Sequence, residues 1–250
     1  NSVFDQFYRG ERLKGRWYDK YHIPLAVLFS SKAVRLGQAP PETVPASNLH
    51  DIGYAFLDPG LKERGESKEN LATVRLSRIL HMQKAAGPAA KILIESGDFS
   101  PAEISNIINT VVCHDNGNIG LPIEEEPLLL CVRDADRTLV MHLVSFYKDW
   151  LSIASQREDF SLLDLFRSRM VGFYDASDAA PIIWGKPEKL TKEDKFSSHR
   201  VPFTPLAKEW RDRQFDARWW EIQQNILRDK AVFRQYAEEH IRAELVAGRG

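Results

Sequence analysis

Residues 100–117 read SPAEISNIINTVVCHDNG and carry the clearest secondary-structure signal in the chain. Ser100, with Glu103 three residues later, forms a capping-box pattern, and Pro101 suits the first position of a helix. The apolar residues that follow keep the spacing of one face of an amphipathic helix: Ile104, Ile107, Ile108, Val111 and Val112. Asn116 and Gly117 then supply a stop signal. The stretch predicts a helix that places His114 at its C-terminal end.

Similar signals on both sides predict that the whole chain is helical. Upstream, we expect helices over residues 21–36, 44–50 and 71–86, separated by glycine and proline signals. Downstream, helical spacing without an internal Gly or Pro predicts one long central helix over residues 126–155. The alternation that is typical of strands is scarce. The sequence therefore predicts an all-α fold.

The length of 250 residues suits one principal core with an extension. Residues 175–203 hold three prolines and many polar residues, which is typical of a long connection over the surface. Thr204 and Pro205 then predict the start of a last helical region, rich in aromatic residues, that reaches about residue 246. We expect a helical domain over residues 1–155. Over residues 156–250 we expect a linker and a C-terminal helical extension that packs on the core or on the partner in a homodimer.

Composition argues against several classes of protein. The chain has 34 basic and 35 acidic residues, so we expect no nucleic-acid partner. No apolar run has the roughly 20 residues of a membrane span. The first residues are too polar for a secretory signal, and we expect a cytoplasmic protein without a membrane partner. The two cysteines, Cys113 and Cys131, lie in apolar stretches and predict buried thiols rather than a disulfide or a thiolate zinc site.

Histidines and carboxylates lie near expected helix ends or on apolar faces. His50 and Asp51 are adjacent and are followed by an Ile-Gly pair, so we expect the helix to end there and both side chains to point to one place. In mid-helix they would diverge by about 100°. Asp136 shares the apolar stripe of its helix, where burying a lone carboxylate is costly unless a cation neutralises it. Asp134 lies about 200° away on that helix and is expected to be a surface charge or an acceptor for a histidine N–H.

The order of these residues resembles the ligand pattern of the HD superfamily of metal-dependent phosphohydrolases: His22, His50, Asp51, His81, His114 and Asp136. Residues 48–53, NLHDIG, resemble the family's LLHDIG helix end, and residues 133–137, RDADR, resemble its DADR segment. The resemblance covers roughly residues 17–150. It implies an HD-domain helical bundle with these six residues as metal ligands.

The resemblance also implies how many metal ions are bound. With His81 and His114 as added histidines, the chain resembles the two-metal branch of the family. In that branch the aspartate of the HD pair, here Asp51, bridges the ions. We therefore expect two divalent metal ions. The nitrogen and oxygen donors suit Fe or Mn. The four positive charges of two such ions would exceed the two negative charges of Asp51 and Asp136. The surplus would attract a phosphate and lower the pKa of a bridging water.

The implied activity is hydrolysis of a phosphoester of a nucleotide or another small phosphorylated metabolite. Asp51 is then part of the catalytic centre. Lys84 and Arg78, one turn to either side of His81, and Arg137, beside the Asp136 ligand, are candidates for binding the substrate phosphate.

Tyr54 departs from the pattern, because many phosphohydrolases of the family have Lys or Glu three residues after the HD aspartate, where the side chain often touches the substrate. Tyr54 is therefore a further candidate catalytic residue. It also keeps open an alternative function, that of an HD-type di-iron oxygenase resembling the inositol or phosphonate oxygenases. A regulatory module that binds nucleotide without turnover is disfavoured because every expected ligand is present.

Overall fold

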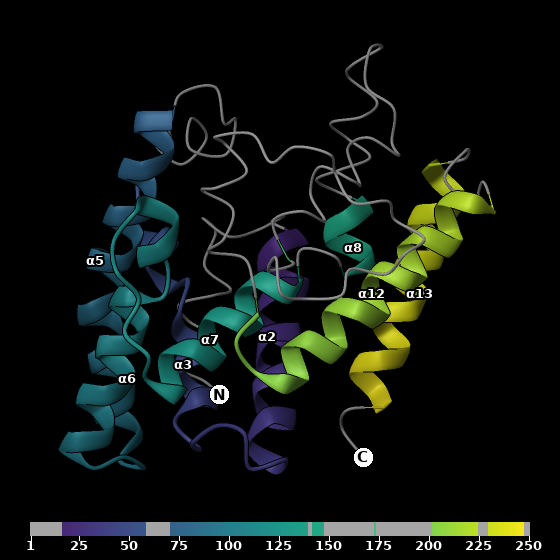
Figure 1. Ribbon diagram of the computed structural model, residues 1–250. Coiled ribbons are helices and arrows are strands. Elements are labelled where there is room, and N and C mark those ends of the chain that lie inside the picture. Colours follow the sequence, from purple (N-terminus) through teal and green to yellow (C-terminus); the bar gives the residue numbers. More distant parts are fainter. Residues whose placement is uncertain are drawn as a thin grey trace. The chain divides into compact units, whose positions relative to one another are not determined.

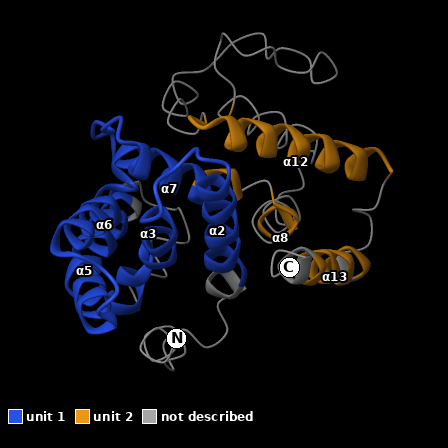
Figure 2. Cartoon of the chain, turned by 90° about the horizontal axis from the view of Figure 1, so that it is seen from below, with its two compact units in different colours: residues 1–136 blue, residues 137–250 orange. Residues whose placement is uncertain are grey.

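The computed structural model describes residues 17–58, 71–139, 142–147, 173, 202–224 and 230–247, and every regular element within these ranges is a helix (Figure 1). The predicted all-α fold is confirmed. The chain divides into two compact units, residues 1–136 and residues 137–250 (Figure 2). The predicted domain boundary after residue 155 falls outside the described residues and stays a prediction.

Unit 1 contains α2 (Trp17–Arg35), α3 (Thr43–Leu49), α5 (Leu71–Ser96), α6 (Pro101–Cys113) and most of α7 (Pro127–Thr138). Two short 3-10 helices, η2 (Ile52–Phe56) and η3 (Asn116–Ile119), follow α3 and α6. Helix α5 packs on η2 and α6, and α3 packs on α2 and α6. In both views α5 and α6 lie side by side (Figures 1 and 2). Their shared core includes Leu49, Ile52, Ala85, Ala89, Leu93, Ile107, Val111 and Val132.

The capping box predicted at residue 100 is present. Ser100 Oγ accepts a hydrogen bond from the Glu103 amide at 3.3 Å, and the Glu103 carboxylate accepts one from the Ser100 amide at 2.7 Å. The helix that starts there ends with His114 as its C-cap residue. The local sequence thus fixes both the start of α6 and the place of this histidine.

Helix α5 is longer than predicted. The expected end at residue 86, before Gly87 and Pro88, is wrong, because the helix continues through the proline to Ser96. A proline inside a helix costs about 3 kcal/mol. Ala85, Ala89 and Leu93 nevertheless recur every four residues and are buried in the core that α5 shares with α6. This packing on both sides of the proline outweighs the cost.

The single helix predicted over residues 126–155 is also wrong. Helix α7 ends at Thr138, and His142 has extended backbone, with ψ at 144°, before α8 (Leu143–Ser145) begins. Apolar side chains on both sides of this break are buried: Val132, Leu139, Leu143, Val144 and Phe146. Because burial continues across the break, apolar periodicity does not detect it.

The described part of unit 2 contains α8, α12 (Pro205–Gln223) and α13 (Lys230–Ala247). As predicted, Thr204 caps α12, its Oγ1 accepting from the Ala207 amide at 3.2 Å. The buried ring of Phe233 on α13 contacts Tyr147, just after α8, with ring centroids 5.4 Å apart. The predicted connection over residues 175–203 lies almost wholly outside the described residues. No helix in the described ranges is both long and apolar enough to cross a membrane.

Candidate metal centre

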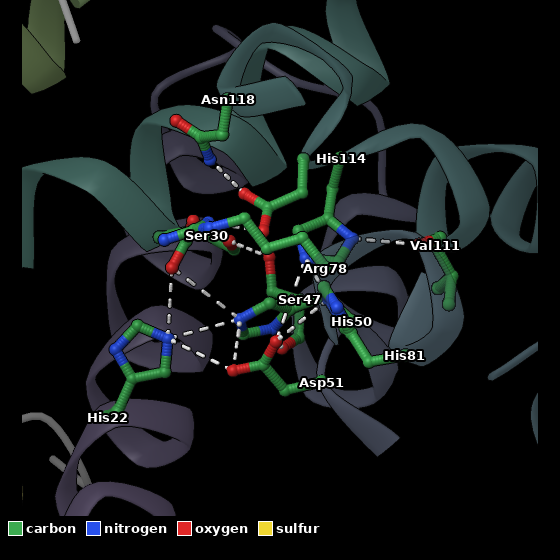
Figure 3. A network of polar contacts seen from close by, with 12 residues as sticks. His22, Ser30, Ser47, His50, Asp51, Arg78, His81, Val111, His114 and Asn118 are labelled. Carbon is green, nitrogen blue, oxygen red and sulfur yellow. Dashed lines mark hydrogen bonds and ion pairs between the residues drawn. The ribbon is translucent and has the colours of Figure 1, made fainter. Parts of the chain in front are cut away.

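Six polar side chains converge in unit 1, and Figure 3 labels all of them except Asp136. His22 comes from α2, His81 from α5 and Asp136 from α7, while the others follow helix ends. All six are buried: His22, His50, Asp51, His81, His114 and Asp136. They are the six residues that the sequence predicted as ligands, and the structure brings all of them together.

The end of α3 explains how two adjacent residues reach one place. His50 is the C-cap residue with helical backbone, whereas Asp51 has left the helix, with φ at −99° and ψ at 6°. Because the chain turns between them, their side chains do not diverge as they would in mid-helix. Asp51 Oδ2 lies 3.3 Å from His50 Nε2, and the geometry expected of the pair is confirmed.

The first group of donors, here called subsite 1, comprises His22, His50, Asp136 and one oxygen of Asp51. The Nε2 atoms of His22 and His50 lie 3.1 Å apart. Asp136 Oδ1 is 3.2 Å from His22 Nε2 and 3.9 Å from His50 Nε2. Asp51 Oδ2 lies 3.7 Å from His22 Nε2. Each of the two nitrogens thus lies within 3.9 Å of one oxygen from each aspartate.

The second group, subsite 2, comprises His81, His114 and the other oxygen of Asp51. The two histidine Nε2 atoms lie 3.3 Å apart. Asp51 Oδ1 is 3.7 Å from His81 Nε2 and 3.6 Å from His114 Nε2. The carboxylate of Asp51 is therefore shared, with one oxygen turned to each subsite.

The paired histidine nitrogens, 3.1 and 3.3 Å apart, have the spacing of metal ligands, and the carboxylate oxygens lie within 3.9 Å of them. Two donors that are each about 2.1 Å from one ion, at the angles of tetrahedral or octahedral geometry, lie about 3.0–3.4 Å apart. In each of the two triads, His22-His50-Asp51 and Asp51-His81-His114, one ligand atom per residue lies within 4.8 Å of the others. These buried groups could hold metal ions. The donors are nitrogen and oxygen, the types that suit divalent transition metals.

Main-chain carbonyls orient two of the histidines. His50 Nδ1 lies 2.7 Å from Ser47 O, and His114 Nδ1 lies 2.7 Å from Val111 O. An Nδ1–H that donates to a carbonyl leaves the Nε2 lone pair free for a metal ion. For His81 the corresponding distance, to the carbonyl oxygen four residues earlier, is 3.4 Å. This ring is held less firmly by its hydrogen bond.

The electrostatics of the two subsites differ. Burial lowers the pKa of His50, but Asp51 and Asp136 outweigh burial and raise that pKa to about 9. Burial raises the pKa of Asp51, yet the charge of His50 and hydrogen bonds with His114 and His50 hold it well below its usual range. Burial, helped by His114, lowers the pKa of His81 to about 4. Subsite 1 thus favours positive charge, and His81 is neutral at pH 7, the form that binds metals.

An ion pair beside subsite 2 is a feature that the sequence reasoning missed. Arg78 Nη1 donates to Asp115 Oδ2 at 2.5 Å, and Asn118 Nδ2 donates to the other oxygen of this buried carboxylate. Asp115 raises the pKa of Arg78. Because Asp115 follows His114 and Arg78 precedes His81 by one turn, the pair ties together the two segments that carry these ligands. The sequence does contain a signal for this pair: Asp115 directly follows the apolar end of a helix, where a buried carboxylate needs a partner.

The remaining predicted site residues lie as follows. Lys84 Nζ donates to Phe56 O at 2.7 Å. Arg137 is half-buried and directly follows Asp136 on α7. The Tyr54 ring stacks on His81. The roles of Lys84, Arg137 and Tyr54 in catalysis stay predictions.

The prediction that Asp134 is a surface charge is wrong, because its side chain is fully buried. Residues 131–136 of α7 are all buried, so this helix has no solvent face over that stretch. The other expectation for Asp134, an acceptor for a histidine N–H, stays a prediction. Helical periodicity separates a buried face from an exposed one only where a helix has both.

No family model matches the sequence, and no curated protein and no solved structure matches it significantly. The order of the six residues along the chain and their geometry are the features that bear on function.

Proposed function

We propose that this chain is a two-metal phosphohydrolase of the HD type, which cleaves a phosphoester of a nucleotide or another small phosphorylated metabolite. The observation that carries the proposal is the position of Asp51, whose two oxygens face two separate pairs of histidines at 3.3–3.7 Å. A carboxylate shared in this way is suited to bridging two ions. The order of the six ligands along the chain supports the same family.

Each of the two subsites offers donors for one metal ion. Subsite 1 offers two imidazoles and two carboxylate oxygens, and subsite 2 offers two imidazoles and one carboxylate oxygen. Two bound divalent ions, Fe or Mn, would act as Lewis acids and would lower the pKa of a bound water, so that hydroxide is available to attack phosphorus near neutral pH. Asp51 and Asp136 carry two negative charges against the four positive charges of such ions. The surplus favours an anionic substrate.

Exposure indicates the side from which a substrate would come. The side chain of Asp136 is 11% exposed and that of Asp51 is 6% exposed, whereas the side chains of the four histidines are 2% exposed or less. The two carboxylates are thus the least covered of the six side chains, and we expect a substrate to approach from their side. Arg137, next to Asp136 in the chain, is our candidate for binding the phosphate.

We expect Arg137→Ala to raise the KM for a phosphorylated substrate by roughly 10–150-fold, because a hydrogen bond to a charged group contributes roughly 1.5–3 kcal/mol. The kcat should change little, since such a contact holds substrate and transition state alike. Steady-state kinetics of phosphate release measure both constants. Arg75→Ala, which removes an exposed arginine of α5, is the matched control. An unchanged KM in the Arg137 variant would place phosphate binding elsewhere.

A screen of phosphorylated metabolites tests the reaction class. We expect release of inorganic phosphate or a phosphomonoester under strict exclusion of O2, and persistence of the activity when Mn²⁺ replaces iron, because hydrolysis uses the ions only as Lewis acids. Metal analysis of anaerobically purified protein identifies the ions that accompany the chain.

The second candidate is a di-iron oxygenase, which the nitrogen-rich set of four histidines and two carboxylates also suits. It would require iron and consume O2. Strict O2 dependence, with no phosphate released from any compound of a broad set, would replace the phosphohydrolase by this alternative.

A further inference from the structure

Tyr54 lies against one of the proposed ligands. Its ring and the His81 imidazole are 4.1 Å apart between centroids and inclined by only 7°, so they stack face to face. Tyr54 belongs to η2, the 3-10 turn that directly follows Asp51. Tyr54, three residues after Asp51, thus contacts a histidine that is distant in sequence.

Of the three histidines whose Nδ1 lies near a main-chain carbonyl oxygen, His81 has the longest such contact. The Nδ1 atoms of His50 and His114 lie 2.7 Å from main-chain carbonyl oxygens, whereas that of His81 lies 3.4 Å from Ser77 O. At that length a hydrogen bond restrains a ring poorly. A parallel aromatic neighbour instead restricts the plane of the imidazole. The direction of His81 Nε2 towards Asp51 depends on that plane.

Residues before and after Tyr54 in the chain are held against α5. A Cβ added to Gly53 would lie 1.7 Å from His81 O, so the η2 backbone is in direct contact with α5. Two residues after Tyr54, the carbonyl oxygen of Phe56 accepts a hydrogen bond from Lys84 Nζ at 2.7 Å. The stack is therefore held by neighbouring contacts and is not the chance meeting of two mobile rings.

We infer that Tyr54 is a positioning residue of subsite 2: its aromatic ring holds the His81 imidazole in the plane that lets Nε2 bind the second ion beside His114 and Asp51. This inference rests on the proposed two-metal function. It assigns to the tyrosine at this position a part in loading the site, and it makes the ring, not the hydroxyl, the group that matters.

The inference is tested by titrating chelator-stripped protein with Mn²⁺. Calorimetry measures the affinity for each ion, and metal analysis after gel filtration counts the ions that stay bound. We expect two ions per chain in the wild type and in Tyr54→Phe, which keeps the stack. Tyr54→Leu should keep the first ion and bind the second about 10–100-fold more weakly, the range found when a group that orients a metal ligand is removed. Tyr147→Leu, which removes a half-buried tyrosine of unit 2, should bind as the wild type does.

The outcomes separate the two proposals. A wild type that binds fewer than two ions overturns the two-metal function. Two tight ions in Tyr54→Leu, or a weakened second ion in both Tyr54→Leu and Tyr54→Phe, overturn only the role of the ring. Circular dichroism establishes that the variants fold. If Tyr54→Leu does not fold, Tyr54→Met takes its place. In the NMR spectrum of the wild type, upfield-shifted ring protons of His81 report the stack directly.

Discussion

Asp51→Ala should leave the protein with at most one ion per chain and without measurable turnover. The substitution removes a ligand from both subsites at once, because each oxygen of this carboxylate faces a different pair of histidines. It also removes the negative charge that a second cation needs nearby. We expect kcat/KM to fall by roughly 10³-fold or more, equivalent to about 4 kcal/mol of lost transition-state stabilisation. Metal analysis and phosphate-release kinetics measure the two effects.

Two control variants separate the charge of Asp51 from its bulk. Asp51→Asn keeps the shape but not the anion, so we expect it to fold and yet to lose the second ion. Asp98→Ala, at an exposed position beyond the end of α5, should match the wild type in both assays. If purified Asp51→Ala kept two ions and normal turnover, Asp51 would not be the bridge.

Gly53→Ala should destabilise the protein by about 3 kcal/mol or more, because overpacking against main-chain atoms leaves no side chain to move aside. The added Cβ would meet His81 O at 1.7 Å, the His81 carbonyl carbon at 2.6 Å and Ala85 N at 3.0 Å. Relief of this clash requires η2 to separate from α5, which would carry His81 away from Asp51. Urea unfolding followed by circular dichroism measures the stability, and the loss of the second ion should accompany it.

Gly87→Ala is the matched comparison on the same helix. A Cβ at Gly87 meets nothing within 4 Å. The gain in helix propensity is opposed by the restriction that the following proline places on a residue with a side chain, so we expect a change of no more than about 1 kcal/mol in either direction. Equal stabilities of the two glycine variants would show that η2 does not approach α5 as closely as the structure has it.

The parts of the fold that depend on neighbours in sequence were predictable. The capping box at Ser100 and the cap at Thr204 involve atoms within three residues, and both helices begin where these signals place them. The continuation of α5 through Pro88 was not predictable in this way. It depends on packing against α6, which a local rule about proline does not contain.

The candidate site shows the same division. The six converging residues could be named because their order resembles a known pattern, and the turn after His50 could be inferred from the sequence around it. Arg78 and Tyr54 were named as candidates, but their contacts with Asp115 and His81 were missed, because these residues meet only after distant segments fold together. Asp134 was assigned to the surface because periodicity assumes a solvent face that α7 lacks over residues 131–136.

The contact between His22 and Asp136, at 3.2 Å, joins side chains from near the two ends of the described part of unit 1. An ion shared by them would bind only when both ends of the unit are in place, so it would stabilise the folded unit and not the unfolded chain. Ion binding and the folding of unit 1 would then be one cooperative event. A chelator would lower the melting temperature of the entire unit, and not merely loosen the walls of the site.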